Sequence, residues 1–156
     1  MRWRWFIPLF CWSIGPTPVA AGADAQLHLL VREYGHQKTI LEFPLNYGEV
    51  FTIRYIHSVD GTPVFEVFRA VKGVGIRLEQ TRFLMFGAGM GHWKGHGKVV
   101  QDGRWTKIEE IHAPLGSFLL RVGSVGVDHT ILLNGKAWNL SETLAGRLVE
   151  VSLSEP

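Results

Sequence analysis

The chain has 156 residues, of which 46% are hydrophobic and 19% are charged. This length favours a single domain, and this apolar content excludes an intrinsically disordered chain. Lys and Arg number 16 and Asp and Glu 14, which gives a formal net charge of +2, and the cations form no run of five. Nucleic acid is therefore not an expected partner, because nucleic-acid-binding proteins concentrate their cations in a patch or along one element.

The first residues have the composition of a secretory signal peptide. Arg2 and Arg4 precede an apolar stretch at residues 5–14, and a segment rich in proline and small residues follows at 15–25. This is the order of the basic, apolar and cleavage regions of an export signal. We therefore predict that the protein is periplasmic.

The end of this signal defines the expected domain boundary. The Ala-x-Ala sequence at 23–25 is a cleavage site, which predicts a signal peptide at 1–25 and a single β domain at 26–156. Cleavage after Ala21 is one alternative. An uncleaved membrane anchor is another, although the apolar stretch is shorter than the roughly 20 residues that a membrane span requires.

The chain contains a single cysteine, Cys11, which lies inside the apolar stretch of the signal. It follows Phe10 rather than a small residue, so no lipid anchor is expected. Once the signal is removed, the exported domain has no thiol. Its stability must then come from its core rather than from the disulfides that are common in exported proteins.

Downstream of the signal, apolar and polar residues alternate in short segments. This period of two is typical of half-buried strands, and Gly, Pro, Asn and Asp separate the segments. The expected fold class is all-β, a small antiparallel β-sandwich or barrel of short meandering strands. The predicted strands are 27–32, 39–43, 50–57, 64–71, 76–86, 98–101, 104–111, 118–122, 129–133, 136–140 and 148–153.

Two connections between these strands carry a strong turn signal. Asp102-Gly103 and Asn134-Gly135 each predict a two-residue type I′ hairpin turn, in which both central residues need a positive φ. One helical turn is predicted over residues 141–145, with Ser141 as its N-terminal cap.

The strand at 50–57 ends in a histidine that shares a face with apolar residues. Phe51, Ile53 and Tyr55 alternate with polar residues, so His57 points to the core side. The next strand carries Glu66 on one face, and a hairpin between the two strands places this carboxylate near the same end as the imidazole. Such a pair can orient a ligand, bind a metal or only fix a turn.

A serine hydrolase site at His57 and Ser58 is not supported. Adjacent residues of an extended strand point to opposite faces, so the imidazole is poorly placed to act as a base for the hydroxyl. The chain also lacks the Gly-x-Ser-x-Gly sequence that positions the serine of an α/β-hydrolase.

The glycine-rich segment at 86–91 follows a predicted strand. A dinucleotide site requires a helix after such a segment, but Gly95 and Gly97 follow within a few residues and disfavour one. Two interpretations remain: a loop whose backbone amides bind an anion, or a bend between strands.

His92 and His96 are four residues apart in this glycine-rich region. That spacing suits a zinc site on a helix but carries little information in a loop. A metal site formed with His57, His112 or His129 would have no thiolate ligand. Solvated loop histidines are the simpler interpretation.

Three blocks of sequence carry a resemblance to a known family. They are Tyr55-x-His57-Ser58-Val59-x-x-Thr62-Pro63-Val64-x-Glu66, then Phe86-Gly87-Ala88-Gly89, then Arg121-Val122-Gly123 ahead of His129. In this order, over residues 27–140, they resemble the domain of unknown function family 1850. This is a family of small exported bacterial proteins encoded beside TRAP transporters of the TAXI type.

The resemblance implies an extracytoplasmic accessory role beside a secondary transporter that works with a separate periplasmic solute-binding protein. It implies no established chemistry. The loop at 91–97 departs from the family pattern. The positions that match the family motifs are His57, Ser58, Thr62, Pro63, Glu66, Gly87, Gly89 and His129.

We therefore predict a binding protein rather than an enzyme, with no cofactor. Its expected partner is a TRAP membrane subunit, the solute-binding protein or a small anionic solute. In the predicted site the imidazoles and the glycine-loop amides donate hydrogen bonds and Glu66 orients one imidazole. The alternative is a metal-dependent periplasmic hydrolase or a histidine metal-binding protein. The predicted ligand-binding residues are His57, Ser58, Thr62, Glu66, Gly87, Gly89 and His129.

Overall fold

The computed structural model of the chain describes residues 27–36, 38–84 and 97–155. The predicted signal peptide lies outside these ranges and stays a prediction. No helix in the described ranges is long and apolar enough to cross a bilayer. In chain order the elements are β1 (Leu27–Glu33), β2 (Thr39–Leu45), β3 (Val50–Ile56), β4 (Pro63–Val71), β5 (Gly75–Phe83), β6 (Lys98–Asp102), β7 (Trp105–Glu109), β8 (Ala113–Gly116), β9 (Phe118–Arg121), β10 (Thr130–Leu133), β11 (Lys136–Asn139), α1 (Ser141–Leu144) and β12 (Leu148–Ser154).

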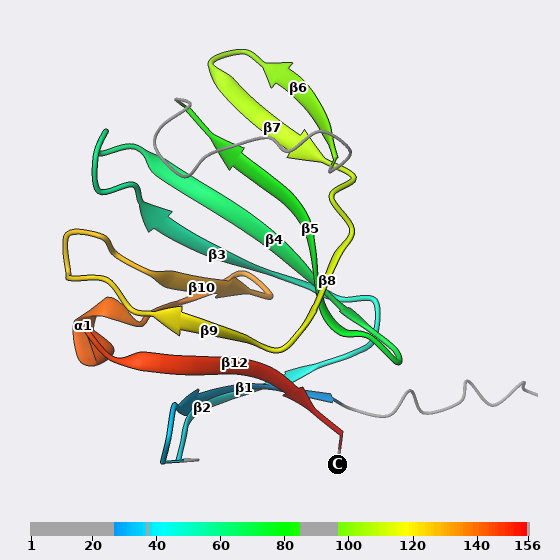
Figure 1. Cartoon of the computed structure of the whole chain (residues 1–156), viewed down its shortest axis with the longest axis vertical. Coiled ribbons are helices and arrows are strands. Elements are labelled where there is room, and N and C mark those ends of the chain that lie inside the picture. The colour runs from blue at the N-terminus through cyan, green and yellow to red at the C-terminus, as the bar shows by residue number, and fades with distance from the viewer. Residues whose placement is uncertain (1–26, 37, 85–96, 156) are drawn as a thin grey trace, which may run out of the picture.

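The strands form two antiparallel sheets that pack face to face (Figure 1). The smaller sheet has four strands in the order β2-β1-β12-β9. The larger sheet has eight strands in the order β11-β10-β3-β4-β5-β7-β6, with β8 paired to β5. Because the described strands form two sheets and close no barrel, the fold is a β-sandwich. The all-β prediction is confirmed, and of its two architectures the structure has the sandwich.

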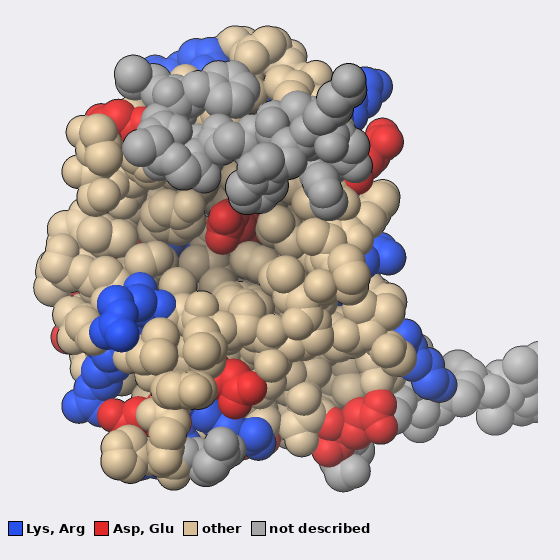
Figure 2. All heavy atoms as spheres, in the orientation of Figure 1, with Lys and Arg blue, Asp and Glu red and all other residues tan. Residues whose placement is uncertain are grey.

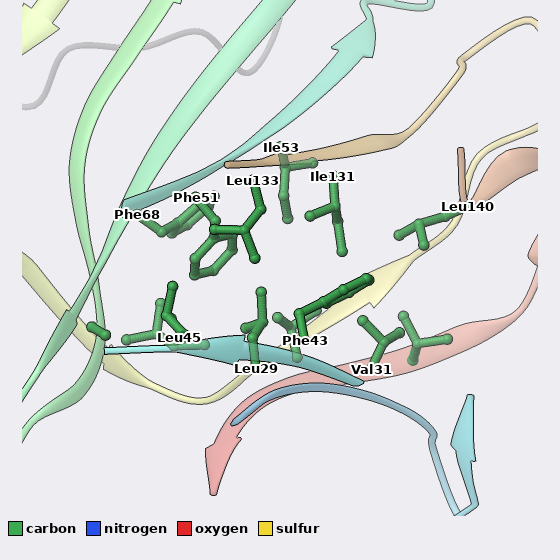
Figure 3. Packing of buried hydrophobic residues seen from close by; sticks show 14 of the residues in the cluster. Leu29, Val31, Phe43, Leu45, Phe51, Ile53, Phe68, Ile131, Leu133 and Leu140 are labelled. Atoms are coloured by element: carbon green, nitrogen blue, oxygen red, sulfur yellow. The ribbon is translucent and has the colours of Figure 1, made fainter. Parts of the chain in front are cut away.

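The main hydrophobic core lies between the two sheets. Figure 3 shows Leu29 and Val31 of β1 facing Phe51 and Ile53 of β3, and all four are at most 2% exposed. Every second residue of a strand points to the same face, so the period-two pattern of the sequence produces this core. We call the face of the larger sheet that carries Phe51 and Ile53 its inner face.

A second, smaller apolar cluster lies on the inner face. It contains Val64 of β4, Phe83 of β5 and Ile108 of β7, all at most 6% exposed. These three residues belong to the larger sheet alone. Tyr55 of β3 packs against both this cluster and the main core, so its ring lies at the boundary between them.

One of the two predicted hairpin turns has the expected form. Leu133 pairs with Lys136, and the two residues between them have φ of 50° and 73°, as a type I′ turn requires. This confirms the prediction for Asn134-Gly135.

The other turn is shifted by one residue. Asp102 pairs with Trp105, so the central residues are Gly103 and Arg104 rather than Asp102 and Gly103. Gly103 has a φ of 60° in the first central position, which is where a type II′ turn places glycine. The type I′ prediction is therefore wrong here, because the aspartate continues the strand.

The predicted helical turn is present as α1, but Ser141 is not its cap. The Ser141 hydroxyl accepts a hydrogen bond from the backbone N–H of His129 at 2.9 Å. The side-chain oxygen of Asn139 instead accepts from the backbone N–H groups of Ser141 and Glu142, at 2.9 and 3.3 Å. The serine is used to hold the segment that precedes β10.

Candidate functional site

A carboxylic acid lies on the inner face of the larger sheet. Glu66 is opposite Ile53 of β3 and Thr81 of β5 in the strand register. On β4 it alternates with Val64 and Phe68, which are 1% and 3% exposed and belong to the two different apolar clusters. The carboxyl group therefore sits between two apolar clusters, and burial raises its pKa.

Tyr55 lies diagonally across the β3–β4 pair from Glu66. It is opposite Val64, one step along the inner face. Burial, and to a lesser extent the charge of Glu66, raise the pKa of Tyr55. The phenol is therefore protonated at neutral pH and can donate a hydrogen bond. The ring centroid of Tyr55 is 5.2 Å from that of His129, so the phenol lies between the carboxyl group and an imidazole.

His129 is 9% exposed and directly precedes β10. Its Nδ1 accepts a hydrogen bond from the backbone N–H of Gly123 at 2.9 Å. Burial lowers the pKa of His129, and the charge of Asp128 opposes this only partly. The ring is therefore neutral at neutral pH and carries its proton on Nε2, because Nδ1 is occupied as an acceptor. Nε2–H is a hydrogen-bond donor.

The backbone on either side of His129 is held by a polar network. Asp128 has a φ of 52° and accepts hydrogen bonds from Arg54 of β3 and from Asn139 of β11. Thr130 donates to the same carboxylate at 3.0 Å. These contacts tie three neighbouring strands together beside the imidazole and fix its position.

His57 is at the end of β3, and its nearest carboxylate is Asp60. Its Nδ1 is 3.4 Å from the Asp60 carboxylate. The backbone N–H and the hydroxyl of Thr62 donate to the same carboxylate at 3.0 and 2.8 Å and are the main cause of its lowered pKa. Thr62 thus fixes the turn, and Ser58 is exposed on it.

The predicted pairing of His57 with Glu66 needs correction. Glu66 is opposite Ile53, four residues before His57 along β3, or about 13 Å at the rise of an extended strand. The glutamate is in the middle of the hairpin rather than near its turn. It therefore neighbours Tyr55, and the imidazole at the turn neighbours Asp60.

Two of the predicted site residues, Glu66 and His129, lie on the inner face, and a third, His57, is buried just beyond the end of β3. Gly87 and Gly89 lie outside the described residues, as do His92 and His96. Among the residues that the structure describes, no group of three His, Cys, Asp or Glu side chains is placed to hold a metal ion.

Sequence reasoning missed two members of this arrangement, Tyr55 and Thr81. Tyr55 was treated as an apolar member of its strand and as the first residue of a family block, but not as a site residue, although its place two residues before His57 puts it on the same face. Thr81, 9% exposed, becomes a neighbour of Glu66 only through the β4–β5 register. We call Tyr55, Glu66, Thr81 and His129 the inner-face cluster.

The inner-face cluster combines hydrogen-bond donors with little net charge. A phenol, a neutral imidazole and a carboxylic acid whose ionisation is disfavoured lie beside apolar side chains. In Figure 2 the charged groups lie mainly around the rim of the visible face, which is hollowed near its centre, where acidic atoms are visible. Few polar groups on an apolar background are typical of small-molecule sites.

The fold is a β-sandwich domain, and the inner-face cluster is a polar, partly buried candidate site on its larger sheet. The family model "Domain of unknown function (DUF1850)" matches residues 51–140, more than half of the chain, and the chain belongs to this family. This confirms the resemblance predicted from the sequence. No curated protein and no solved structure matches the chain. The matched range contains the whole inner-face cluster, whereas β1, β2 and β12 lie outside it.

Proposed function

We propose that the protein is an extracytoplasmic accessory protein of a TAXI-type TRAP transport system and binds a small anionic solute at the inner-face cluster. The placement of Glu66, Tyr55 and His129 in neighbouring positions of one partly buried face carries this proposal. The family membership supports it, because the sequence blocks that resemble the family suggest a role beside such a transporter.

The charge state of the cluster favours an anion over a cation. Tyr55 and His129 each offer a donor, and Glu66 adds another while it is protonated. An anionic oxygen accepts from all three, and hydrogen bonds to an ionised group are about twice as strong as those between neutral groups. A cation would require an ionised Glu66, which burial disfavours.

Calorimetry of the purified protein with dicarboxylates and amino acids tests solute binding. Pull-down with the TRAP membrane subunits and solute-binding protein tests the transporter association separately. We expect one bound solute per chain. The proposal fails if none of these solutes binds and neither transporter component is retained.

Tyr55→Phe removes the central donor and keeps the ring that packs against both apolar clusters. We expect the dissociation constant for the solute to rise about tenfold or more, because a hydrogen bond to a charged group contributes roughly 1.5–3 kcal/mol. The midpoint of thermal unfolding should change little. The comparison is made by calorimetry at one pH.

Tyr47→Phe is the matched control for this variant. Tyr47 donates its hydroxyl hydrogen bond to Glu155, near the C-terminus, and is not a member of the inner-face cluster. Its removal should leave solute affinity unchanged. Equal losses in the two variants would place the solute elsewhere on the protein.

A further inference from the structure

The outer face of the larger sheet carries a row of cationic and aromatic side chains. The row follows the register of four adjacent strands, β3, β4, β5 and β7, which lie side by side in Figure 1. Arg54 is opposite Phe65, Phe65 is opposite Arg82, and Arg82 is opposite Lys107. All four side chains are partly exposed, so the row is part of the protein surface.

The centre of the row is built around Arg82. Its guanidinium carbon is 4.2 Å from the ring centroid of Trp105, a cation–π contact. The Trp105 ring meets Phe65 edge to face, with centroids 5.7 Å apart. Trp105, whose ring packs against Phe65, therefore holds the arginine in place. A guanidinium that is already ordered loses less entropy when it binds a carboxylate.

The charges of the row are unevenly compensated. Arg54 is paired with Asp128, and Lys107 is 2.6 Å from Asp102. No carboxylate among the described residues forms an ion pair with Arg82, and its buried Nε has no hydrogen-bond partner there. Asp102 also interacts electrostatically with Arg82, so Arg82 and Lys107 share one carboxylate and the row keeps an excess of positive charge.

A second group of cations lies further along the same strands. Arg69 of β4 is opposite Arg77 of β5, and both bond to the single carboxylate of Glu79, at 3.1 and 2.7 Å. Arg77 is five residues from Arg82 on β5, but a bulge lies between them, and their partners Arg69 and Phe65 on β4 are four residues apart, or about 13 Å at the rise of a strand. Positive charge therefore exceeds negative charge at two points along β5.

We propose that this outer face docks an extended acidic segment of a partner protein, with one carboxylate of that segment on Arg82. The spacing of the two cationic points suits a chain of about five extended residues, and a single small anion cannot reach both. A nucleic acid fits less well, because the cations of the chain form no run of five that could follow a phosphate backbone. The proposal concerns a face opposite to the inner-face cluster, so it is independent of the solute.

The test uses a hexaglutamate peptide as the probe and the full chain labelled with nitrogen-15. We expect the peptide to shift the indole N–H resonance of Trp105 and to leave that of Trp138, which packs against Phe43 on the inner side, unchanged. Binding should weaken as sodium chloride is raised, since salt screens exposed charges.

Arg82→Glu should raise the apparent dissociation constant of the peptide about tenfold or more. Arg104→Glu is the control. Arg104 is exposed in the adjacent turn, and its substitution changes the net charge by the same amount as Arg82→Glu. It should alter affinity no more than about twofold, as general attraction between distant surface charges is screened. Arg82→Gln, which keeps a side chain of similar length, should also weaken binding if Arg82→Glu fails to fold.

Three results would overturn the proposal. The first is an absence of any Trp105 shift with hexaglutamate. The second is equal weakening by Arg82→Glu and Arg104→Glu, which would mean that the peptide responds to net charge alone. The third is Arg82-dependent binding of phosphatidylglycerol vesicles or of a single-stranded oligonucleotide in the absence of peptide binding, which would assign the face to another kind of partner.

Discussion

Glu66→Gln is expected to make the protein more stable above pH 5 and to leave its stability near pH 4 almost unchanged. Burial raises the folded-state pKa of Glu66 above its ordinary value of 4.5, so the unfolded chain releases this proton at lower pH than the folded protein. Stability is therefore lost as pH rises from 4.5 through the raised folded pKa. The loss is about 1.4 kcal/mol for each unit by which the pKa is raised. The glutamine has no such cost.

Denaturant unfolding at a series of pH values measures this difference. The quantity of interest is the free energy of unfolding of the variant minus that of the wild type, which should grow with pH and then level off. Glu109→Gln, on the outer face of β7 and opposite Lys98, is the control for loss of one carboxylate. A difference that stays constant from pH 4 to pH 8 would contradict an inner-face carboxyl group with a raised pKa.

The same variant separates stability from binding. If the proposed solute needs a protonated Glu66, wild-type affinity should fall as pH rises through the folded pKa of Glu66. A glutamine amide stays neutral at every pH and still donates a hydrogen bond. The variant should therefore bind the solute with an affinity that depends less on pH, which calorimetry at pH 5 and pH 8 can measure. A buried carboxyl that lowers stability is expected at a site kept for binding.

The sequence was sufficient to predict the fold class because its information is local. Alternation at Phe51 and Ile53 identifies a strand with one buried face, and the Asn134-Gly135 turn follows from the φ values that only such residues adopt readily. The four-residue strand β8 was missed, since it follows Glu110 and His112, both with positive φ, and is too short for a period to be visible. Division into two sheets depends on long-range pairing, such as β1 with β12.

The candidate site was only partly predictable, because alternation along a strand is local information and the pairing of strands is not. The period of two predicts inward-facing positions for His57 and Glu66; the register places Glu66 on the inner face, and His57 is buried just beyond the end of β3. It does not give the register, and only the register shows that Glu66 meets Thr81 and lies diagonal to Tyr55. Asp60 was overlooked as the partner of His57, because a side chain that folds back within its own turn leaves no periodic signal.

Gly123→Ala is expected to cost roughly 2–3 kcal/mol of stability, because a methyl group has no space at this position. A Cβ atom built on Gly123 would lie 2.5 Å from the Cβ of Val127, and the backbone of the loop would have to move. The same residue donates the N–H that occupies Nδ1 of His129. Its displacement therefore frees Nδ1, and the imidazole can adopt the other tautomer and lose its donor toward the inner-face cluster.

Gly126→Ala provides a control within the same loop. Its Cβ would approach nothing closer than the Ser124 hydroxyl at 3.9 Å, so little loss of stability is expected. Thermal unfolding compares the two variants, and nitrogen-15 spectra of the His129 ring report its tautomer. Gly123→Ala should lose solute affinity by about tenfold at a temperature where it is fully folded. If the tautomer changes and the affinity does not, the Nε2–H of His129 takes no part in solute binding.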